Sequence, residues 1–234
     1  PTTMYKPLLK KFFLSTAALF FAMLVLPQQA QAQEQIIYEL KLAGMRVTSL
    51  NCGDLSSIDG VSGTAKFDPE SKTLTLDNAT ISTSVIKFPG LENSIKGLTI
   101  RLIGDNTITS ENYWGLFNNT ERSITFTGSG KLTVNGSTTA PQTGYRRAIF
   151  NWGTIVVDGC TLEANGGVYG IGSGFWKFVN CNVRTKGGGG SQSDEYAGSL
   201  TWMWDKEPEF VGCKITSPAG VSWKKFQNNG YDNY

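Results

Sequence analysis

The chain has 234 residues, with 21 Lys and Arg against 19 Asp and Glu, a formal net charge of +2, 27 glycines, four cysteines and no histidine. Without an imidazole the chain cannot build a Ser-His-Asp triad, a Cys-His dyad or a His-ligated zinc site. Hydrophobic residues at 40% and charged residues at 17% are typical of a chain that folds, and the charge is too small to indicate a nucleic-acid partner.

The first segment has the pattern of a signal peptide. Three lysines precede an apolar run from Phe12 to Leu26, and Ala30-Gln31-Ala32 follows it. A basic start, a short apolar run and a small-x-small site are the features of an export signal. The run is also shorter than the roughly 20 residues that span a bilayer. We therefore predict that residues 1–32 are cleaved and that the protein is secreted, periplasmic or held at the cell surface, with no segment inserted in the membrane.

Cleavage would leave a nearly neutral chain. The predicted signal contains three lysines and no acid, so 18 basic and 19 acidic groups remain, for a net charge of −1. The basic balance therefore belongs to the signal, and no electrostatic argument for DNA or anionic membranes survives its removal.

The rest of the chain repeats a tight turn followed by an apolar residue. The apolar residue stands at positions 81, 108, 132, 162, 183 and 215, at intervals of 21 to 32 residues. Uneven intervals are typical of a solenoid in which each unit is one turn of the chain and the loops vary in length.

Each unit has the pattern of three short strands. First strands are expected at 73–76, 98–102, 123–126 and 154–157, and third strands at 115–118, 148–151 and 170–173, because these segments alternate in polarity or are β-branched. In a second strand, Cys160, Leu162 and Ala164 should point inward, while Thr161 and Glu163 point outward. The same inward set recurs as Cys181, Val183 and Thr185, and as Cys213, Ile215 and Ser217.

These features predict an all-β fold, a single-stranded right-handed parallel β-helix of about six coils. Coils stacked at about 4.8 Å satisfy the backbone groups that one coil leaves unpaired. An antiparallel β-sandwich is the alternative, but it does not explain why the turns recur in register. Residues 33–72 are expected to form an N-terminal cap or irregular first coil, 73–222 the β-helix, and 223–234 a C-terminal cap or tail.

Three runs of the sequence, 62–81, 98–108 and 128–134, are similar to runs in secreted, largely uncharacterised bacterial right-handed β-helix proteins of the pectin-lyase-like superfamily. The similarity covers roughly residues 36–217 and implies the β-helix fold. For an enzyme it also implies a calcium site of clustered acids, with Arg or Lys as the base.

A calcium-assisted polysaccharide lyase or a glycoside hydrolase is therefore the enzyme alternative, with calcium as its only cofactor. The chain offers Asp158 and Glu163 in one unit and Arg184 and Lys186 in the next. No face shows acids recurring in register, so we assign no catalytic or metal-ligating residue and favour a protein that is not an enzyme.

Aromatic residues give the stronger functional signal. Tyr113, Tyr145, Tyr169 and Tyr196 each precede a third-strand segment, at intervals of 24 to 32 residues. They are accompanied by Trp114, Arg146, Arg147, Trp152, Trp176 and, after a long interruption, Trp202. Tyr and Trp faces stack on sugar rings, and Arg donates paired hydrogen bonds to hydroxyls or uronates.

We predict that these residues form a stripe that binds a polysaccharide or surface glycan. The alternative for each tyrosine is packing within the bends of the solenoid. A purely structural or adhesion module is the third function class. The sequence names neither the ligand nor the oligomeric state.

Cys160, Cys181 and Cys213 fall at one repeat position, so we expect them to stack. Adjacent strands bring Cα atoms within disulfide range, and an oxidising compartment permits a disulfide ladder. Cysteine also serves as a small apolar residue in a narrow core, which is the interpretation that we favour. Cys52 lies outside this set.

Overall fold

The computed structural model describes residues 34–188, 198–217, 219–228 and 230–234. The chain divides into two compact units, residues 1–35 and 36–234, and the elements described below belong to the second. The predicted signal peptide lies outside the described residues. Within them, no helix is long and apolar enough to cross a membrane.

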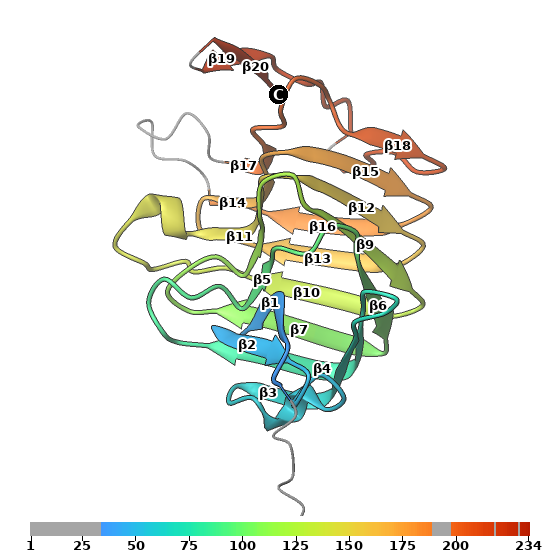
Figure 1. Ribbon diagram of the computed structural model, residues 1–234. Coiled ribbons are helices and arrows are strands. Elements are labelled where there is room, and N and C mark those ends of the chain that lie inside the picture. Colours follow the sequence, from blue (N-terminus) through green and yellow to red (C-terminus); the bar gives the residue numbers. More distant parts are fainter. Residues whose placement is uncertain (1–33, 189–197, 218, 229) are drawn as a thin grey trace, which may run out of the picture. The chain divides into compact units, whose positions relative to one another are not determined.

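The described part of the chain is all-β. Strands β1 to β20 form two large sheets and a C-terminal hairpin (Figure 1). The helical segments among these residues are two short 3-10 turns, η1 (Leu55–Ser57) and η2 (Thr143–Tyr145). The predicted all-β class is confirmed.

The first large sheet has the order β17-β14-β11-β8-β5-β1-β2. Its strands are β1 (Ile37–Leu42), β2 (Met45–Thr48), β5 (Leu91–Asn93), β8 (Leu116–Asn118), β11 (Arg147–Asn151), β14 (Tyr169–Gly172) and β17 (Gly198–Thr201). From β5 to β17 every pairing is parallel, whereas β1 pairs antiparallel with β2 and β5. The third strands expected from the sequence are β8, β11 and β14.

The second large sheet has the order β16-β13-β10-β7-β4-β6-β9-β12-β15-β18, with β3 added antiparallel to β4. Its strands are β3 (Val61–Asp68), β4 (Thr73–Thr83), β6 (Leu98–Ile103), β7 (Asp105–Ser110), β9 (Ser123–Gly128), β10 (Lys131–Asn135), β12 (Thr154–Asp158), β13 (Thr161–Asn165), β15 (Phe175–Val179), β16 (Asn182–Lys186) and β18 (Glu209–Val211). Apart from β3, its pairings are parallel.

Strand β4 joins the two halves of this curled sheet, which are the strands from β7 to β16 on one side of it and the strands from β6 to β18 on the other. Residues 73–77 pair with β6, and residues 80–83 pair with β7. Between them Asn78 has a φ of 47°, a left-handed conformation that Asn tolerates better than most residues. From β5 to β16 the chain visits the first sheet once and the second sheet twice in each cycle.

The register of the repeat differs from the predicted alignment by two residues at one step. The sequence alignment places Leu132 beside Ile108, but the structure pairs Ile108 with Val134. A shift of two residues leaves each side chain on the same face of a strand, so the hydrophobic pattern cannot detect it. In the following strands Leu132, Leu162 and Val183 are in register as predicted.

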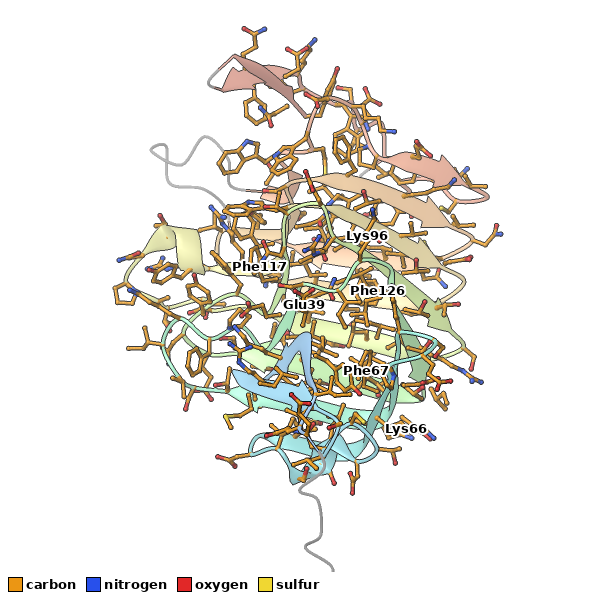
Figure 2. The ribbon with its side chains drawn as sticks, viewed as in Figure 1. Glu39, Lys66, Phe67, Lys96, Phe117 and Phe126 are labelled. Atoms are coloured by element: carbon orange, nitrogen blue, oxygen red, sulfur yellow. The ribbon has the colours of Figure 1, made fainter. Side chains whose placement is uncertain are left out.

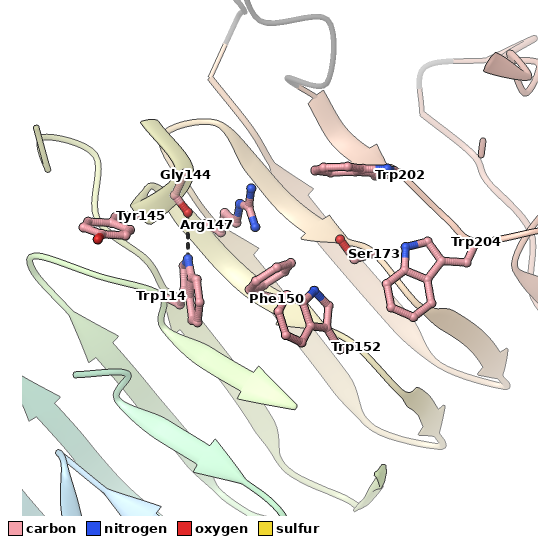
Figure 3. Close-up of a pocket in the computed structure, with 9 residues that line it drawn as sticks. All are labelled: Trp114, Gly144, Tyr145, Arg147, Phe150, Trp152, Ser173, Trp202 and Trp204. Atoms are coloured by element: carbon pink, nitrogen blue, oxygen red, sulfur yellow. Dashed lines mark hydrogen bonds between the residues drawn. The ribbon is translucent and has the colours of Figure 1, made fainter. Parts of the chain in front are cut away.

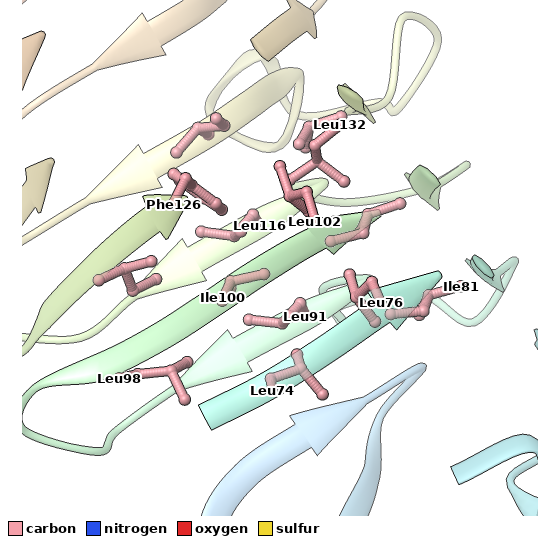
Figure 4. Close-up of a cluster of buried hydrophobic side chains, with 14 of the residues drawn as sticks. Leu74, Leu76, Ile81, Leu91, Leu98, Ile100, Leu102, Leu116, Phe126 and Leu132 are labelled. Atoms are coloured by element: carbon pink, nitrogen blue, oxygen red, sulfur yellow. The ribbon is translucent and has the colours of Figure 1, made fainter. Parts of the chain in front are cut away.

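Apolar side chains from both large sheets fill one core. Figure 4 shows part of it as adjacent rows of leucines and isoleucines, together with Phe126 and Leu132. Phe67 and Phe126 belong to this core, whereas Phe117 belongs to a separate cluster (Figure 2). Each fully buried Leu or Ile contributes about 1.5–3 kcal/mol relative to an exposed one. Repetition of these rows therefore stabilises the stack of strands.

The predicted alternation in β13 is confirmed. Cys160, Leu162 and Ala164 are buried, and Thr161 and Glu163 are partly exposed. The next strand, β16, keeps the same pattern but lies at the edge of the sheet, so its inward side chains are only half-buried.

The second strand predicted for the last unit is absent. Residues 213–217 contain no strand in the structure. Only Cys213 and Ile215 in this segment are partly buried. The segment therefore buries too little apolar surface to be held as a further edge strand.

The C-terminal residues form a hairpin of β19 (Phe226–Asn228) and β20 (Tyr231–Asn233). Met203 and Tyr234 exchange two backbone hydrogen bonds of 3.0 Å, and Met203 is buried. Lys225 and Asp232 form an ion pair of 2.6 Å. The segment predicted as a cap or tail is thus joined to the residues that follow β17.

Buried asparagines connect successive strands of the first sheet. Asn93, Asn118 and Asn151 are each fully buried and lie at the ends of β5, β8 and β11. The Nδ2 of Asn93 donates to the Oδ1 of Asn118, and the Nδ2 of Asn118 donates to the Oδ1 of Asn151, both at 2.8 Å. The row supplies the partners that buried amides require.

Candidate ligand-binding pocket

A second apolar cluster lies on the face of the first sheet that points away from the core. Leu116 and Ile149 are paired neighbours that point into the core. Phe117 and Phe150, the next residues, are also paired, and they belong to the separate cluster. Side chains alternate between the faces of a strand, so the two phenylalanines project outward, where other aromatic side chains cover them.

An open pocket of about 510 Å³ is formed over this cluster. Its described lining is Trp114, Gly144, Tyr145, Arg147, Phe150, Trp152, Ser173, Trp202 and Trp204 (Figure 3). These residues come from β11, from η2 and from the segments that adjoin β8, β14 and β17. The parallel stacking of the first sheet therefore brings four successive turns of the chain to one site.

Trp114 forms one wall of the pocket and is held in place. Its Nε1 donates to the carbonyl oxygen of Gly144 at 2.7 Å (Figure 3). Its ring lies 4.5 Å from that of Phe150 and 4.1 Å from that of Tyr113, measured between centroids. Tyr113 in turn contacts Tyr145 at 4.6 Å, and burial raises the pKa of the Tyr113 hydroxyl. These contacts fix the rings before any ligand arrives.

Trp152 is the exposed aromatic platform of the site. Its side chain follows β11 and is 39% exposed. It contacts the rings of Phe150 and Phe117 at 5.2 and 5.6 Å, in both cases edge to face. This geometry supports the indole on the phenylalanines while solvent still reaches it.

Arg147 lies among the aromatic rings. Its guanidinium carbon is 4.1 Å from the ring centroid of Phe150, 5.0 Å from that of Tyr169 and 5.8 Å from that of Trp202. Distances below about 6 Å are typical of cation–π contacts. Its Nε is buried and has no hydrogen-bond partner among the described residues. The pocket therefore combines apolar ring faces with a fixed positive charge that can still donate a hydrogen bond.

Comparison with protein-family models, with curated proteins and with solved structures found no match for this chain.

The structure brings half of the ten residues of the predicted stripe together in the pocket. The predicted residues that line the pocket are Trp114, Tyr145, Arg147, Trp152 and Trp202. Tyr113 packs behind Trp114 and Tyr145. Tyr196 lies outside the described residues.

Tyr169 and Trp176 are buried, so the prediction that they offer stacking faces to a glycan is wrong. Tyr169 is fully buried, and burial raises the pKa of its hydroxyl to about 12. Trp176 occupies an inward position of β15 and packs in the core, where its Nε1 donates to the carbonyl oxygen of Ser173 at 2.7 Å. For Tyr169 the structure agrees with the alternative of packing within the solenoid.

Arg146 has a different task from its neighbour. Its Nε donates to the carbonyl oxygen of Ala140 at 2.7 Å, which connects the end of the loop before β11 to the middle of that loop. It does not belong to the described lining of the pocket. Arg146 therefore orders the loop, whereas Arg147 lines the pocket, although the two residues are adjacent in sequence.

Sequence reasoning missed Phe150 and Trp204. Phe117 and Phe150 occupy the same place in Leu116-Phe117-Asn118 and Ile149-Phe150-Asn151, and this recurrence was the available signal. Trp202 and Trp204 both line the pocket, whereas Met203 between them is buried.

All four cysteines are unbridged in the structure. Burial raises the pKa of Cys160 to about 11, and burial together with the nearby Cys213 thiol raises that of Cys181 to about 12. Cys213 donates from Sγ to the carbonyl oxygen of Phe178 at 3.2 Å. Protonated thiols are poor nucleophiles and poor metal ligands, so this row packs rather than reacts.

The described lining of the pocket includes none of the charged residues considered for the enzyme alternative, which are Asp158, Glu163, Arg184 and Lys186. In that part of the chain, no group of three or more His, Cys, Asp or Glu is placed to hold a metal ion. Glu163 forms an ion pair with Lys131 at 3.6 Å on the outside of the second sheet. None of the nine described lining residues of the pocket carries a carboxylate.

Proposed function

We propose that this protein binds glycans through the aromatic pocket and does not transform them chemically. The exposed indole of Trp152, supported from behind by Phe117 and Phe150, is the observation that carries the proposal. The apolar face of a pyranose ring packs against such a ring face, while the sugar hydroxyls remain free to bond with polar groups.

The size and stiffness of the pocket support this proposal. A volume of about 510 Å³ lies within the range of roughly 300–1,000 Å³ that is usual for small-molecule sites. The hydrogen bond of Trp114 to Gly144 and the ring contacts of Tyr145 order the wall in advance. A preordered wall lowers the entropy cost of binding.

The absence of carboxylates from the described lining supports binding without catalysis. Most glycoside hydrolases need two carboxylates roughly 5–10 Å apart on either side of the scissile bond. The described lining offers aromatic rings, one guanidinium, one serine and one glycine instead. These groups can hold a sugar but supply no acid and base pair.

We also propose that the two parallel sheets are the walls of a right-handed β-helix of the pectin-lyase-like type. The repeated order of one strand in the first sheet and two in the second, with parallel pairing between cycles, supports this. So does the row of buried asparagines. In this arrangement residues 33–72 and 223–234 would cap the coils, and the predicted signal would export the domain from the cytoplasm.

A glycan array with variants of the protein tests the binding proposal. We expect Trp152→Ala to weaken binding at least tenfold, because stacking on the indole is lost. Phe88→Ala is the matched control, since Phe88 is 43% exposed and does not line the pocket. Equal binding by wild type and Trp152→Ala, or no glycan bound at all, would contradict the proposal.

A second measurement tests the absence of catalysis. The protein is incubated with polygalacturonate and alginate, with and without calcium, while the absorbance of unsaturated product is followed. We expect no increase in absorbance. An increase in absorbance that a chelator abolishes would overturn the non-catalytic proposal and favour the alternative of a calcium-assisted lyase.

A further inference from the structure

The charge of Arg147 has no counterion among the described residues. The ion pairs there involve lysines only, on Asp or Glu side chains elsewhere in the fold. Phe150 and Tyr169 contact the guanidinium with their rings and cannot accept the hydrogen bond that its buried Nε offers. An unmet donor on a charged group in an apolar setting is costly. The guanidinium also lines the pocket, so an acidic group of a ligand there would offset its charge.

The sign of this charge restricts the ligand. Aromatic cages often bind cations, but here Arg147 already occupies the cage and would repel a second positive charge. A neutral sugar could stack on Trp152 but would leave the positive charge of the Arg147 guanidinium without a counterion. A ligand that carries an acidic group could do both, because Arg pairs with carboxylate or sulfate oxygens through two parallel N–H groups.

We propose that the pocket selects acidic sugars, whose carboxylate or sulfate pairs with Arg147 while the sugar ring stacks on Trp152. This inference rests on the proposed glycan binding and adds the chemical class of the glycan. The sugar ring and the acidic group are recognised by different residues. The two contributions can therefore be separated by experiment.

The test compares matched glycans that differ only in the acidic group. Oligogalacturonate is compared with its carboxyl-reduced form, keratan sulfate with its desulfated form, and sialyllactose with its carboxyl-reduced form. We expect the wild type to bind at least one acidic member about tenfold or more tightly than its neutral partner. The pairs show whether carboxylate or sulfate is preferred.

Variants of Arg147 then assign the preference to this residue. Arg147→Gln should abolish the preference, so that the ratio of the affinities for the acidic and the neutral member falls to about one, whatever the variant does to binding of the neutral member. Arg101→Gln is the matched control, since it removes the same charge from an exposed position on β6 and should keep the preference. Arg147→Lys keeps a charge in the pocket but loses the paired N–H groups, so it should bind the acidic member several-fold more weakly than wild type.

The outcomes separate the two proposals. If the wild type binds acidic and neutral members equally, the inference about acidic sugars is overturned and glycan binding stands. If it binds none of them, both fail. If Arg147→Gln does not fold, Arg147→Lys decides, and an unchanged affinity for the acidic member in that variant overturns the role of Arg147.

Discussion

Asn118 donates from Nδ2 to the Oδ1 of Asn151 at 2.8 Å and accepts at its own Oδ1 from Asn93 at the same distance. All three amides are fully buried. Asn118 also donates to the carbonyl oxygen of Arg122, so both hydrogens of its Nδ2 are used. Three consecutive strands of the first sheet are thus joined through side chains as well as through the backbone, and removal of the central amide breaks both links.

We predict that Asn118→Ala lowers the free energy of unfolding by about 2–4 kcal/mol, because the buried amides of Asn93 and Asn151 each lose a hydrogen-bond partner. Urea denaturation followed by circular dichroism measures the change. Asn182→Ala, on an exposed position of β16, is the control and should change stability by less than about 0.5 kcal/mol. Equal stability of the two variants would show that the row of asparagines is not a stabilising feature.

Gly172 is required by the close approach of the Tyr169 ring. A Cβ added at Gly172 would lie 2.5 Å from Cε2 of Tyr169, whose side chain is fully buried. We predict that Gly172→Ala destabilises the protein by about 1–3 kcal/mol and alters its near-UV circular dichroism, because the buried ring must move. Gly198→Ala on the neighbouring strand is the control.

At Gly198 the nearest atom to an added Cβ is 3.7 Å away, so the control should fold with nearly unchanged stability. If Gly172→Ala behaves in the same way, the ring of Tyr169 is free to shift and the packing behind the pocket is looser than described. Binding of the glycan by Gly172→Ala then shows whether this packing supports the pocket.

The all-β class and the strand positions follow from the sequence because they depend on local patterns. β-Branched alternation predicts β12 and β13, and it assigns Leu162 inward and Glu163 outward. The register in which strands far apart in sequence pair is harder to predict from the sequence. Ile108 pairs with Val134 rather than Leu132, and a two-residue slip leaves the inward and outward pattern unchanged.

The pocket was predictable as a group of aromatic residues but not residue by residue. Trp152 and Trp176 look alike in sequence, yet one is exposed and the other lies in the core. The difference depends on where each strand turns, since Trp152 follows the end of β11 and Trp176 stands at an inward position of β15. Only the three-dimensional path of the chain supplies that information.

The cysteine row makes a prediction about thiol reactivity. Burial raises the pKa of Cys160 to about 11 and, together with the Cys213 thiol, that of Cys181 to about 12, so both should be almost entirely protonated at pH 8. We expect both to react with a disulfide reagent far more slowly in the folded protein than in urea, where all four cysteines should react without prior reduction. Fewer than four thiols in urea would instead reveal a disulfide and restore the ladder interpretation.

The same burial predicts a loss of stability in alkali. Burial raises the pKa of Cys160 from about 9 to about 11 and that of Tyr169 from about 10 to about 12. Between these values the folded protein holds protons that the unfolded chain has released, so the free energy of unfolding decreases as the pH rises. The stabilisation is complete below pH 9 and is lost progressively from pH 9 to 12. Each group contributes a slope of up to about 1.4 kcal/mol per pH unit within its own window.

Tyr169→Phe isolates one of these groups, because it keeps the ring and removes the hydroxyl that ionises. Among the described residues that hydroxyl meets only the Ser173 side chain, at a long 3.4 Å, so the variant should match the wild type near pH 8. Between pH 10 and 12 its stability should fall less steeply than that of the wild type. Urea denaturation at each pH gives both curves. Parallel curves would mean that the Tyr169 hydroxyl ionises at the same pH in the folded and unfolded chains, against the burial that the structure assigns to it.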